Sequence, residues 1–209
     1  MSDVPRNRQQ ERSERSTRAL LDAAAELIVE GGFDSLTFAT IGERAGYSRG
    51  LVTARFGSKD GLIEALIERI VGTWNHRNVL PQTKGRAGLE GLSILLDAIR
   101  AQAERDPTGL QVLYALSFEA VGGEQELRAR FAKLHETMRT DFLTILRRGK
   151  RDGSIDPSIN ARREAVLIMA GLRGVAFQWM LDPDAVDPVD ALAYLHDTTV
   201  ARLSADGAG

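Results

Sequence analysis

Apolar residues in this chain recur three and four positions apart in almost every segment that lies between glycine or proline residues. Residues 16–30 show the pattern at Leu20, Ala24, Leu27 and Ile28. Such spacing lines one face of an α-helix, whereas a half-buried strand would alternate apolar and polar residues. No alternating run bounded by turn residues stands out, and no internal repeat is evident. The sequence therefore predicts an all-α fold with about nine helices.

The clearest change of composition is the stretch NHRNVLPQTKGRAG at residues 75–88. Proline, glycine and polar residues interrupt the helical pattern there, which is typical of a linker. We therefore expect a small N-terminal unit and a larger C-terminal unit. The expected helices are residues 16–30, 37–45, 48–56, 58–74, 88–105, 109–121, 124–152, 159–181 and 188–204.

The residue types that most enzymes need are missing or scattered. Without cysteine, the sequence offers no disulfide, no thiolate nucleophile and no cysteine-ligated metal. Its three histidines, at positions 76, 135 and 196, lack His-Glu-x-x-His spacing, and there is no Walker-type glycine loop or nucleophile elbow. Glu119 is the one carboxylate that its apolar surroundings allow to be buried, where a ligand contact or a surface position is favoured over catalysis. We predict no catalytic residue, no metal and no cofactor.

Two observations bear on the location of the protein. No apolar run approaches the roughly 20 residues that are needed to span a bilayer. The N-terminal arginines are not followed by the apolar stretch of a secretory signal. We therefore expect a cytoplasmic protein without a membrane partner.

Charge is distributed unevenly, although the net charge is only −2. Residues 1–18 hold five arginines against three carboxylates, and residues 42–60 hold four basic residues against two, so each stretch carries +2. A local basic cluster matters more for nucleic-acid contact than the total, but it is equally typical of a solvated surface. Arg6, Arg8 and Arg12 precede the first expected helix in a polar stretch that should be disordered, either as a DNA-contacting arm or as an inert tail.

Two short helices joined by a tight turn are predicted in residues 37–56. Thr37 and Ser48 have N-cap side chains that can begin a helix, and Gly46 suits the left-handed residue that ends the first one. This helix-turn-helix arrangement can place its second helix in the major groove of DNA. An ordinary helical hairpin with solvated arginines has the same spacing, so spacing alone leaves both interpretations open.

The second helix of this pair has a predicted inner and outer face. Val52 and Phe56 are its best-spaced large apolar pair and are expected to point inward. The outward positions would combine arginines, which contact guanine or phosphate, with apolar atoms that contact thymine methyl groups. Lys59 lies in the first turn of the next helix, where free backbone N–H groups favour a phosphate. The predicted DNA contacts are Thr37, Ser48, Arg49, Leu51, Thr53, Arg55 and Lys59.

A resemblance to a known family is carried by about a dozen positions in order. They are Leu20-Leu21-Asp22-Ala23-Ala24, Gly31-Gly32-Phe33, Thr37, Ile41, Ala45-Gly46, Ser48, Gly50, Phe56, Ser58-Lys59 and Leu62. Residues 14–74 thereby resemble the three-helix DNA-binding domain of the tetracycline-repressor (TetR) family. Residues 75–204 resemble its helical effector-binding and dimerisation domain in layout only. The resemblance implies a homodimer that binds palindromic operator DNA and represses transcription until a small molecule binds.

The chain departs from the family pattern within the expected recognition helix. The family usually has aromatic residues near positions 53 and 54 and histidine near 55, where this chain has Thr53, Ala54 and Arg55. Tyr47 stands where a small aliphatic residue is common. Because the aromatic residues near positions 53 and 54 are absent, the tyrosine contact to phosphate that the family pattern implies is missing, and Thr53 or Arg55 would have to replace it. The departures concern the operator sequence more than DNA binding itself.

Residues 163–181 are apolar around nearly the whole expected helix. A surface helix normally has one apolar stripe, so this helix should be covered on two sides. With residues 188–204 it resembles the four-helix dimer interface of the family, and the alternative is the central helix of a monomeric bundle. The predicted interface residues are Leu172, Val175, Trp179, Met180, Leu192 and Leu195.

A pocket for an apolar effector is expected among the helices of residues 88–152, where aromatic and aliphatic residues gather. The candidate ligand contacts are Tyr114, Phe118, Glu119 and His135. The helix from Ser58 to about Trp74 is the expected connection between pocket and DNA contacts. We predict a ligand-responsive transcriptional repressor. The alternative is a helical small-molecule-binding or adaptor protein without specific operator binding.

Overall fold

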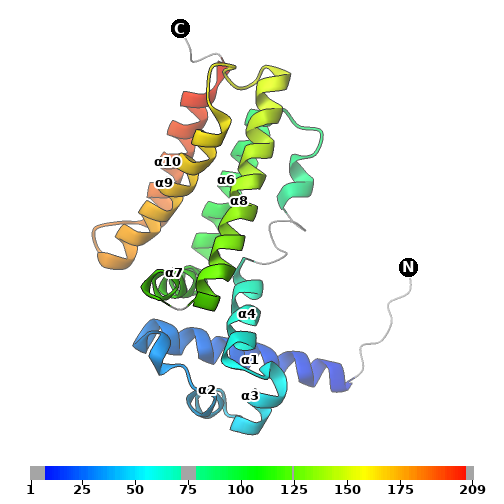
Figure 1. The fold of residues 1–209 in the computed structure, drawn as a ribbon, viewed down its shortest axis with the longest axis vertical. Helices are drawn as coiled ribbons and strands as arrows, with labels where there is room; N and C mark the ends of the chain where they lie inside the picture. Colours follow the sequence, from blue (N-terminus) through cyan, green and yellow to red (C-terminus); the bar gives the residue numbers. More distant parts are fainter. Residues whose placement is uncertain (1–7, 72–78, 124, 206–209) are drawn as a thin grey trace. The chain divides into compact units, whose positions relative to one another are not determined.

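The computed structural model describes residues 8–71, 79–123 and 125–205, and the statements below concern these residues. They form nine α-helices and two short 3-10 helices, and apart from one isolated bridge between Ile155 and Ser204 they contain no strand (Figure 1). The expected all-α fold is thus confirmed. The chain divides into two compact units, Met1–Ile70 and Val71–Gly209. The boundary predicted after Trp74 lies outside the described residues.

The N-terminal unit consists of four α-helices and one 3-10 helix: α1 (Arg8–Gly31), η1 (Phe33–Ser35), α2 (Phe38–Ala45), α3 (Arg49–Phe56) and α4 (Lys59–Ile70). Helix α1 packs on α2 and α4, and α3 packs on the same two helices. All four contribute to one core, whose largest fully buried side chains are Leu20, Ile28, Ile41, Leu62 and Leu66.

Helix α1 begins at Arg8, whereas the sequence predicted a start near residue 16. Arg8 and Arg12 are therefore helical and exposed, so the expectation of a disordered arm is wrong for both, and Arg6 lies outside the described residues. The first two turns, RQQERSER, have no apolar spacing and gave no periodic signal. They nevertheless consist mostly of good helix formers, which extend a helix that the core residues have already nucleated.

The C-terminal unit contains η3 (Leu80–Thr83), α6 (Gly88–Arg105), α7 (Pro107–Gly122), α8 (Gln125–Asp152), α9 (Ala161–Leu181) and α10 (Pro188–Leu203). Helix α6 packs on α8 and α10, α9 packs on α8 and α10, and α7 packs on α8 and α9. Helices α6 and α8 approach most closely at two glycines, because a Cβ atom added at Gly88 would lie 2.1 Å from the backbone nitrogen of Gly149. The unit is therefore a helical bundle whose core is shared by α6, α8, α9 and α10.

Helix α9 is the one element, among the described residues, whose length and mean hydropathy of 1.3 would allow it to cross a membrane. The core helices of soluble proteins have the same properties, and one side of α9 is buried in the bundle core at Ala165, Ile168 and Met169. The sequence predicted that both sides of this helix would be covered, and the core of its own unit covers one of them. The other side carries exposed Val166 and Leu167.

Candidate functional site

Thr37 is the N-cap of α2, the first helix of the predicted pair, as expected. The Oγ1 atom of Thr37 accepts a hydrogen bond from the Thr40 backbone N–H at 3.1 Å, and Thr40 Oγ1 accepts one from the Thr37 N–H at 3.1 Å. These reciprocal bonds satisfy backbone donors that the first turn of a helix leaves open. Thr37 is exposed and stands at the start of α2.

The turn between α2 and α3 has the geometry that the sequence predicted. Gly46 ends α2 in the left-handed conformation with φ 74°, and Ser48 Oγ accepts a hydrogen bond from the Leu51 N–H at 3.2 Å. Gly42 gave no signal in the sequence, yet a Cβ atom added there would lie 2.8 Å from the Tyr47 carbonyl oxygen. The tight packing of the turn against α2 therefore depends on Gly42, inside the helix, as well as on Gly46, which ends it.

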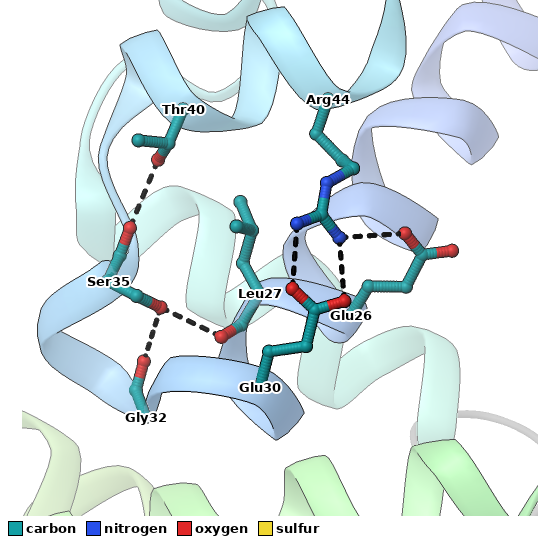
Figure 2. Close-up of polar contacts among 7 residues, drawn as sticks. All are labelled: Glu26, Leu27, Glu30, Gly32, Ser35, Thr40 and Arg44. Atoms are coloured by element: carbon teal, nitrogen blue, oxygen red, sulfur yellow. Dashed lines mark hydrogen bonds and ion pairs between the residues drawn. The ribbon is translucent and has the colours of Figure 1, made fainter.

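An ion pair joins α2 to α1 (Figure 2). The Arg44 guanidinium donates to both carboxylate oxygens of Glu30, at 2.9 and 2.7 Å, and to Glu26 at 3.3 Å. The hydrogen bond from Arg44 lowers the pKa of the Glu30 carboxyl group. The pair is solvent-exposed and contributes little to stability, but it takes Arg44 out of the basic cluster that the sequence suggested for nucleic acid.

A second set of contacts in Figure 2 ties the segment before α2 to the end of α1. Ser35 Oγ donates to the carbonyl oxygens of Leu27 at 2.8 Å and Gly32 at 2.7 Å, and Thr40 Oγ1 donates to the Ser35 carbonyl at 3.0 Å. Side-chain hydrogen bonds of Ser35, before the N-cap, and of Thr40, after it, therefore hold the start of α2 in place.

Arg55 was expected on the outer face of α3, and this orientation is wrong. Its guanidinium points to α1, where it donates to Ser13 Oγ at 2.6 Å and to Ser16 Oγ at 3.3 Å. The half-buried side chain is long enough to cover apolar surface with its stem while its charged end reaches these hydroxyl groups. Arg55 thus connects α3 to α1, and its predicted DNA contact stays a prediction.

Lys59 also has partners within the protein. Its ammonium group donates to the Phe33 carbonyl oxygen at 3.1 Å and lies 3.6 Å from the centroid of the Phe33 ring. This arrangement combines a hydrogen bond with a cation–π contact and ties α4 to η1. A phosphate would have to share the ammonium group with Phe33, so the predicted phosphate contact remains open.

The outer face of α3 is consequently defined by few groups. Val52 is fully buried and Phe56 half-buried, which confirms the predicted inner face. Ser48, Arg49 and Thr53 are exposed, and Leu51 is half-buried. Of the four basic residues in positions 42–60, Arg49 alone has a side chain without a polar partner in the described part of the chain, although its carbonyl oxygen accepts a hydrogen bond from Thr53 Oγ1 at 3.1 Å. The candidate nucleic-acid interface is therefore Thr37 at the start of α2 together with Ser48, Arg49 and Thr53.

The C-terminal unit contains a cavity of about 560 Å³ between α7, α8 and α9. It is lined by Tyr114, Ser117, Phe118, Ala120, Val121, Arg128, Phe131, Ala132, His135, Arg139, Arg173, Gly174 and Phe177. Three of the four predicted ligand residues are among them. The sequence had placed the pocket within residues 88–152 because the whole of the next helix was assigned to the dimer interface, and α9 in fact supplies one wall.

Glu119, the fourth predicted ligand residue, is exposed and does not line the cavity. The apolar run around it covers only one side of α7, and Glu119 lies on the other. The carboxylate that is buried is Glu164, near the start of α9, which accepts a hydrogen bond from Arg202 at 2.7 Å. Of the two positions that the sequence left open for Glu119, the structure has the surface position, and the predicted ligand contact stays a prediction that the cavity lining does not support.

Two titratable groups in the cavity are held uncharged at neutral pH. Tyr114 is buried and donates to the Leu172 carbonyl oxygen at 3.3 Å, and burial raises its pKa. His135 is half-buried and its ring lies in an edge-type arrangement with that of Phe131, with centroids 6.4 Å apart. Burial together with the charges of Arg173 and Arg139 lowers the pKa of His135 to about 4. Its Nε2 atom is buried without a hydrogen-bond partner in the described structure.

A serine, a histidine and an aspartate also meet outside the cavity, and the spacing along the chain gives no sign of this contact because it joins two helices. Ser93 Oγ lies 2.8 Å from His196 Nε2, and His196 Nδ1 lies 2.8 Å from Asp197. The order of groups is that of a hydrolase triad. Ser93, however, stands in the middle of α6, where neighbouring backbone N–H groups are bonded within the helix and are not free to stabilise an oxyanion. The three groups tie α6 to α10.

The predicted interface residues divide into two groups. Leu172 and Leu192 are 8% and 7% exposed and belong to the core of the unit. Val175 and Leu195 pack against that core from its edge, and Trp179 and Met180 are half-buried. The large apolar side chains that α9 and α10 expose most are instead Val166, Leu167, Leu181 and Tyr194.

Two family models match the chain. Residues 20–66 match the model of bacterial regulatory proteins of the tetR family, and residues 89–204 match that of the C-terminal region of BetI-type transcriptional repressors. The transcriptional regulator TtgR of Pseudomonas putida is 24% identical over 203 residues, which cover 94% of this chain and 95% of that protein. The transcriptional regulator BetI of Burkholderia lata is 26% identical over 192 residues, which cover 90% and 93%.

Solved structures share the fold. The complex of SmeT with triclosan has a TM-score of 0.78 and 20% identity, and the match covers 92% of this chain and 93% of that one. SmeT is the repressor of a multidrug efflux pump of Stenotrophomonas maltophilia. The similarity extends over both units of the chain.

Proposed function

Because the chain belongs to the tetR family of bacterial regulatory proteins, we propose that it is a cytoplasmic, ligand-responsive repressor that binds palindromic operator DNA as a homodimer. A small molecule in the cavity of the C-terminal unit releases it from the DNA. The observation that carries the proposal is the helix-turn-helix with a capped, exposed outer face on α3.

The DNA-binding part of the proposal rests on Arg49 and its neighbours. Arg49 and Thr53 lie one helical turn apart on α3, so both can reach base edges when the helix lies in the major groove. Thr37 and Ser48, at the starts of α2 and α3, are suited to phosphate contacts, because helix N-termini present free backbone N–H groups. A symmetric dimer would place two such helices about one turn of DNA apart, roughly 34–36 Å.

The effector part of the proposal rests on the cavity. Its volume of about 560 Å³ lies in the range that holds drug-sized ligands, and its lining combines aromatic side chains with a few polar groups. SmeT, which shares the fold, forms a complex with triclosan. That complex supports the proposal that this chain also binds a small effector.

The dimer part of the proposal rests on the outer faces of α9 and α10. Val166 and Leu167 on α9 are 53% and 57% exposed, and Tyr194 on α10 is 73% exposed. Exposed apolar patches on a soluble chain commonly mark an interface. A two-fold interface of this kind brings the same surface of each subunit together.

One observation favours the alternative, a helical small-molecule-binding or adaptor protein without specific operator binding. Arg44, Arg55 and Lys59 all have partners inside the N-terminal unit, which leaves Arg49 as the free cation of this cluster in the described structure. Selection of random duplexes on the purified protein, followed by gel shifts with the selected site and with its own promoter region, separates the two. Enrichment of a palindrome supports the repressor, and binding that is weak and independent of sequence supports the alternative.

A further inference from the structure

The lining of the cavity is unbalanced in charge. It contains Arg128, Arg139 and Arg173 but no aspartate or glutamate. In the described part of the chain, none of the three arginines forms an ion pair with a carboxylate. His135, with a pKa of about 4, adds no charge at neutral pH. A ligand that enters the cavity therefore meets three positive charges that the protein itself does not neutralise.

Arg173, on α9, is the most confined of the three. Its guanidinium lies 5.0 Å from the centroid of the Tyr114 ring and donates to the sulfur of Met138 at 3.5 Å. Its Nε atom is buried without a partner. A hydrogen bond between Arg173 and the Tyr114 side chain also acts on the pKa of Tyr114. The guanidinium thus has only neutral partners, whereas its planar fork of donors matches a carboxylate. A carboxylate bound to this guanidinium would be a stronger hydrogen-bond partner than these neutral groups, because hydrogen bonds between two charged groups are the stronger ones.

The rest of the cavity is suited to an apolar group. The rings of Phe118 and Phe177 meet edge to face with centroids 5.6 Å apart, and Phe131 lines the wall beside them. A fully apolar effector, which the sequence suggested, would fill this part and leave the arginines without an anion. A ligand with one anionic group and an apolar body would satisfy both parts.

We infer that the cavity binds an amphipathic organic carboxylate, with the carboxylate on Arg173 and the apolar body among the three phenylalanine rings. Arg139 and Arg128 add to the attraction from the α8 side. The role of such a compound as the effector rests on the proposed function, whereas its binding in the cavity does not. The inference deepens the proposed function by naming the ligand class.

The test is calorimetric titration of the full chain with pairs of ligands that differ only in charge. Octanoate is compared with octanamide, and 2-naphthoate with 2-naphthamide. In at least one pair the carboxylate should bind roughly 10- to 100-fold more tightly than its amide, because hydrogen bonds to a charged group are the stronger ones. The two pairs also distinguish an aliphatic from an aromatic body.

Three variants locate the effect. Arg173→Gln should lower the affinity for the carboxylate to that of the amide, and Arg173→Lys should keep part of the preference. Arg147→Gln removes an exposed arginine of α8 that does not line the cavity and should bind as the unchanged protein does. If neither Arg173 variant folds, the carboxylate–amide comparison on the unchanged protein still decides.

The inference is overturned if amide and carboxylate bind equally in both pairs, if neither carboxylate binds at millimolar concentration, or if folded Arg173→Gln keeps the preference. Gel shifts with the selected duplex, on the same preparations without ligand, test the proposed function separately. A protein that binds DNA specifically but shows no carboxylate preference refutes the inference alone. A protein that prefers the carboxylate but binds no specific DNA refutes the proposed function alone.

Discussion

At the scale of single residues, two arginines of α3 that look equivalent in the sequence have different surroundings. The Arg49 side chain is exposed without a polar partner in the described structure, whereas Arg55 is bonded to Ser13 and Ser16 of α1. We therefore propose direct DNA contact for Arg49, whereas the hydrogen bonds of Arg55 contribute to the packing of the N-terminal unit.

The two arginines can be separated by mutation. Arg49→Ala should weaken specific DNA binding by about 1–3 kcal/mol and leave the melting temperature unchanged, because an exposed contact to a base is lost. Arg55→Ala should lower the free energy of unfolding by about 1 kcal/mol, because two hydrogen bonds to α1 are lost. Gel-shift titration and thermal unfolding of both variants measure the two effects. An Arg55→Ala variant that keeps its stability but loses DNA affinity would restore the contact that the sequence predicted.

His135 should make the stability of the protein depend on pH. Its pKa is lowered from 6.5 to about 4 in the folded protein, chiefly by burial. Between these values the unfolded chain binds a proton that the folded chain does not, so stability falls as the pH falls from 6.5 towards 4. Since the side chain is only half-buried, the loss is at most about 2 kcal/mol.

His135→Gln should remove this part of the pH dependence. Urea unfolding of both proteins at pH 7 and pH 5 gives the difference, in which all groups common to the two proteins cancel. The same change of stability with pH in both would show that His135 titrates normally in the folded protein.

At the scale of secondary-structure elements, α9 carries three roles on different faces. Ala165, Ile168 and Leu172 face the core, Arg173 and Phe177 line the cavity, and Leu167 lies on the exposed side. The sequence of this helix is apolar around nearly its whole circumference because the core, the cavity and the exposed side each take apolar residues from it. The exposed side is the one that we assign to the dimer.

A charge on the exposed side of α9 should separate the subunits without unfolding them. Leu167→Asp should be a folded monomer by light scattering at micromolar concentration, because the side chain is already 57% exposed within one chain. Leu172→Asp should instead unfold the unit, since it buries an unpaired charge. Val121→Asp, at an exposed position of α7, is the control and should stay dimeric. A Leu167→Asp dimer with unchanged stability would place the interface elsewhere.

At the scale of the whole molecule, the proposed function requires that the two units influence each other. A ligand can shift the protein away from the DNA-bound form only by its difference in affinity for the two forms. The helix expected to connect the units includes α4, which ends at Ile70, and Trp74, which lies outside the described residues.

The coupling can be measured in both directions. If a carboxylate lowers operator affinity, saturating operator must lower carboxylate affinity by the same factor, with a coupling of typically 1–3 kcal/mol. Titration of the carboxylate with and without the selected duplex measures one direction, and gel shifts with and without the carboxylate measure the other. If the carboxylate binds equally well with and without the duplex, the cavity binds a ligand but does not regulate DNA binding.

The sequence by itself determined the features that depend on neighbours three or four residues away. The helices were predicted because apolar residues line one face at that spacing, and the caps at Thr37, Ser48 and Gly46 were predicted because their bonds or backbone angles are local. Where the spacing carried no signal, as in the first two turns of α1, the predicted helix began too late, near residue 16 instead of Arg8.

Only the tertiary structure decided what the long polar side chains contact and which helices enclose the cavity. Arg55 bonds to Ser13 and Ser16, which precede it by 42 and 39 positions. Arg44 bonds to Glu26 and Glu30, which precede it by 18 and 14 positions. Glu119, a predicted ligand residue, does not line the cavity, and Arg173, which the spacing did not single out, does, because helix packing sets which side of α7 and α9 faces α8. A flexible side chain with a charged end can reach any partner that packing brings within a few ångströms, and spacing along the chain does not specify that partner.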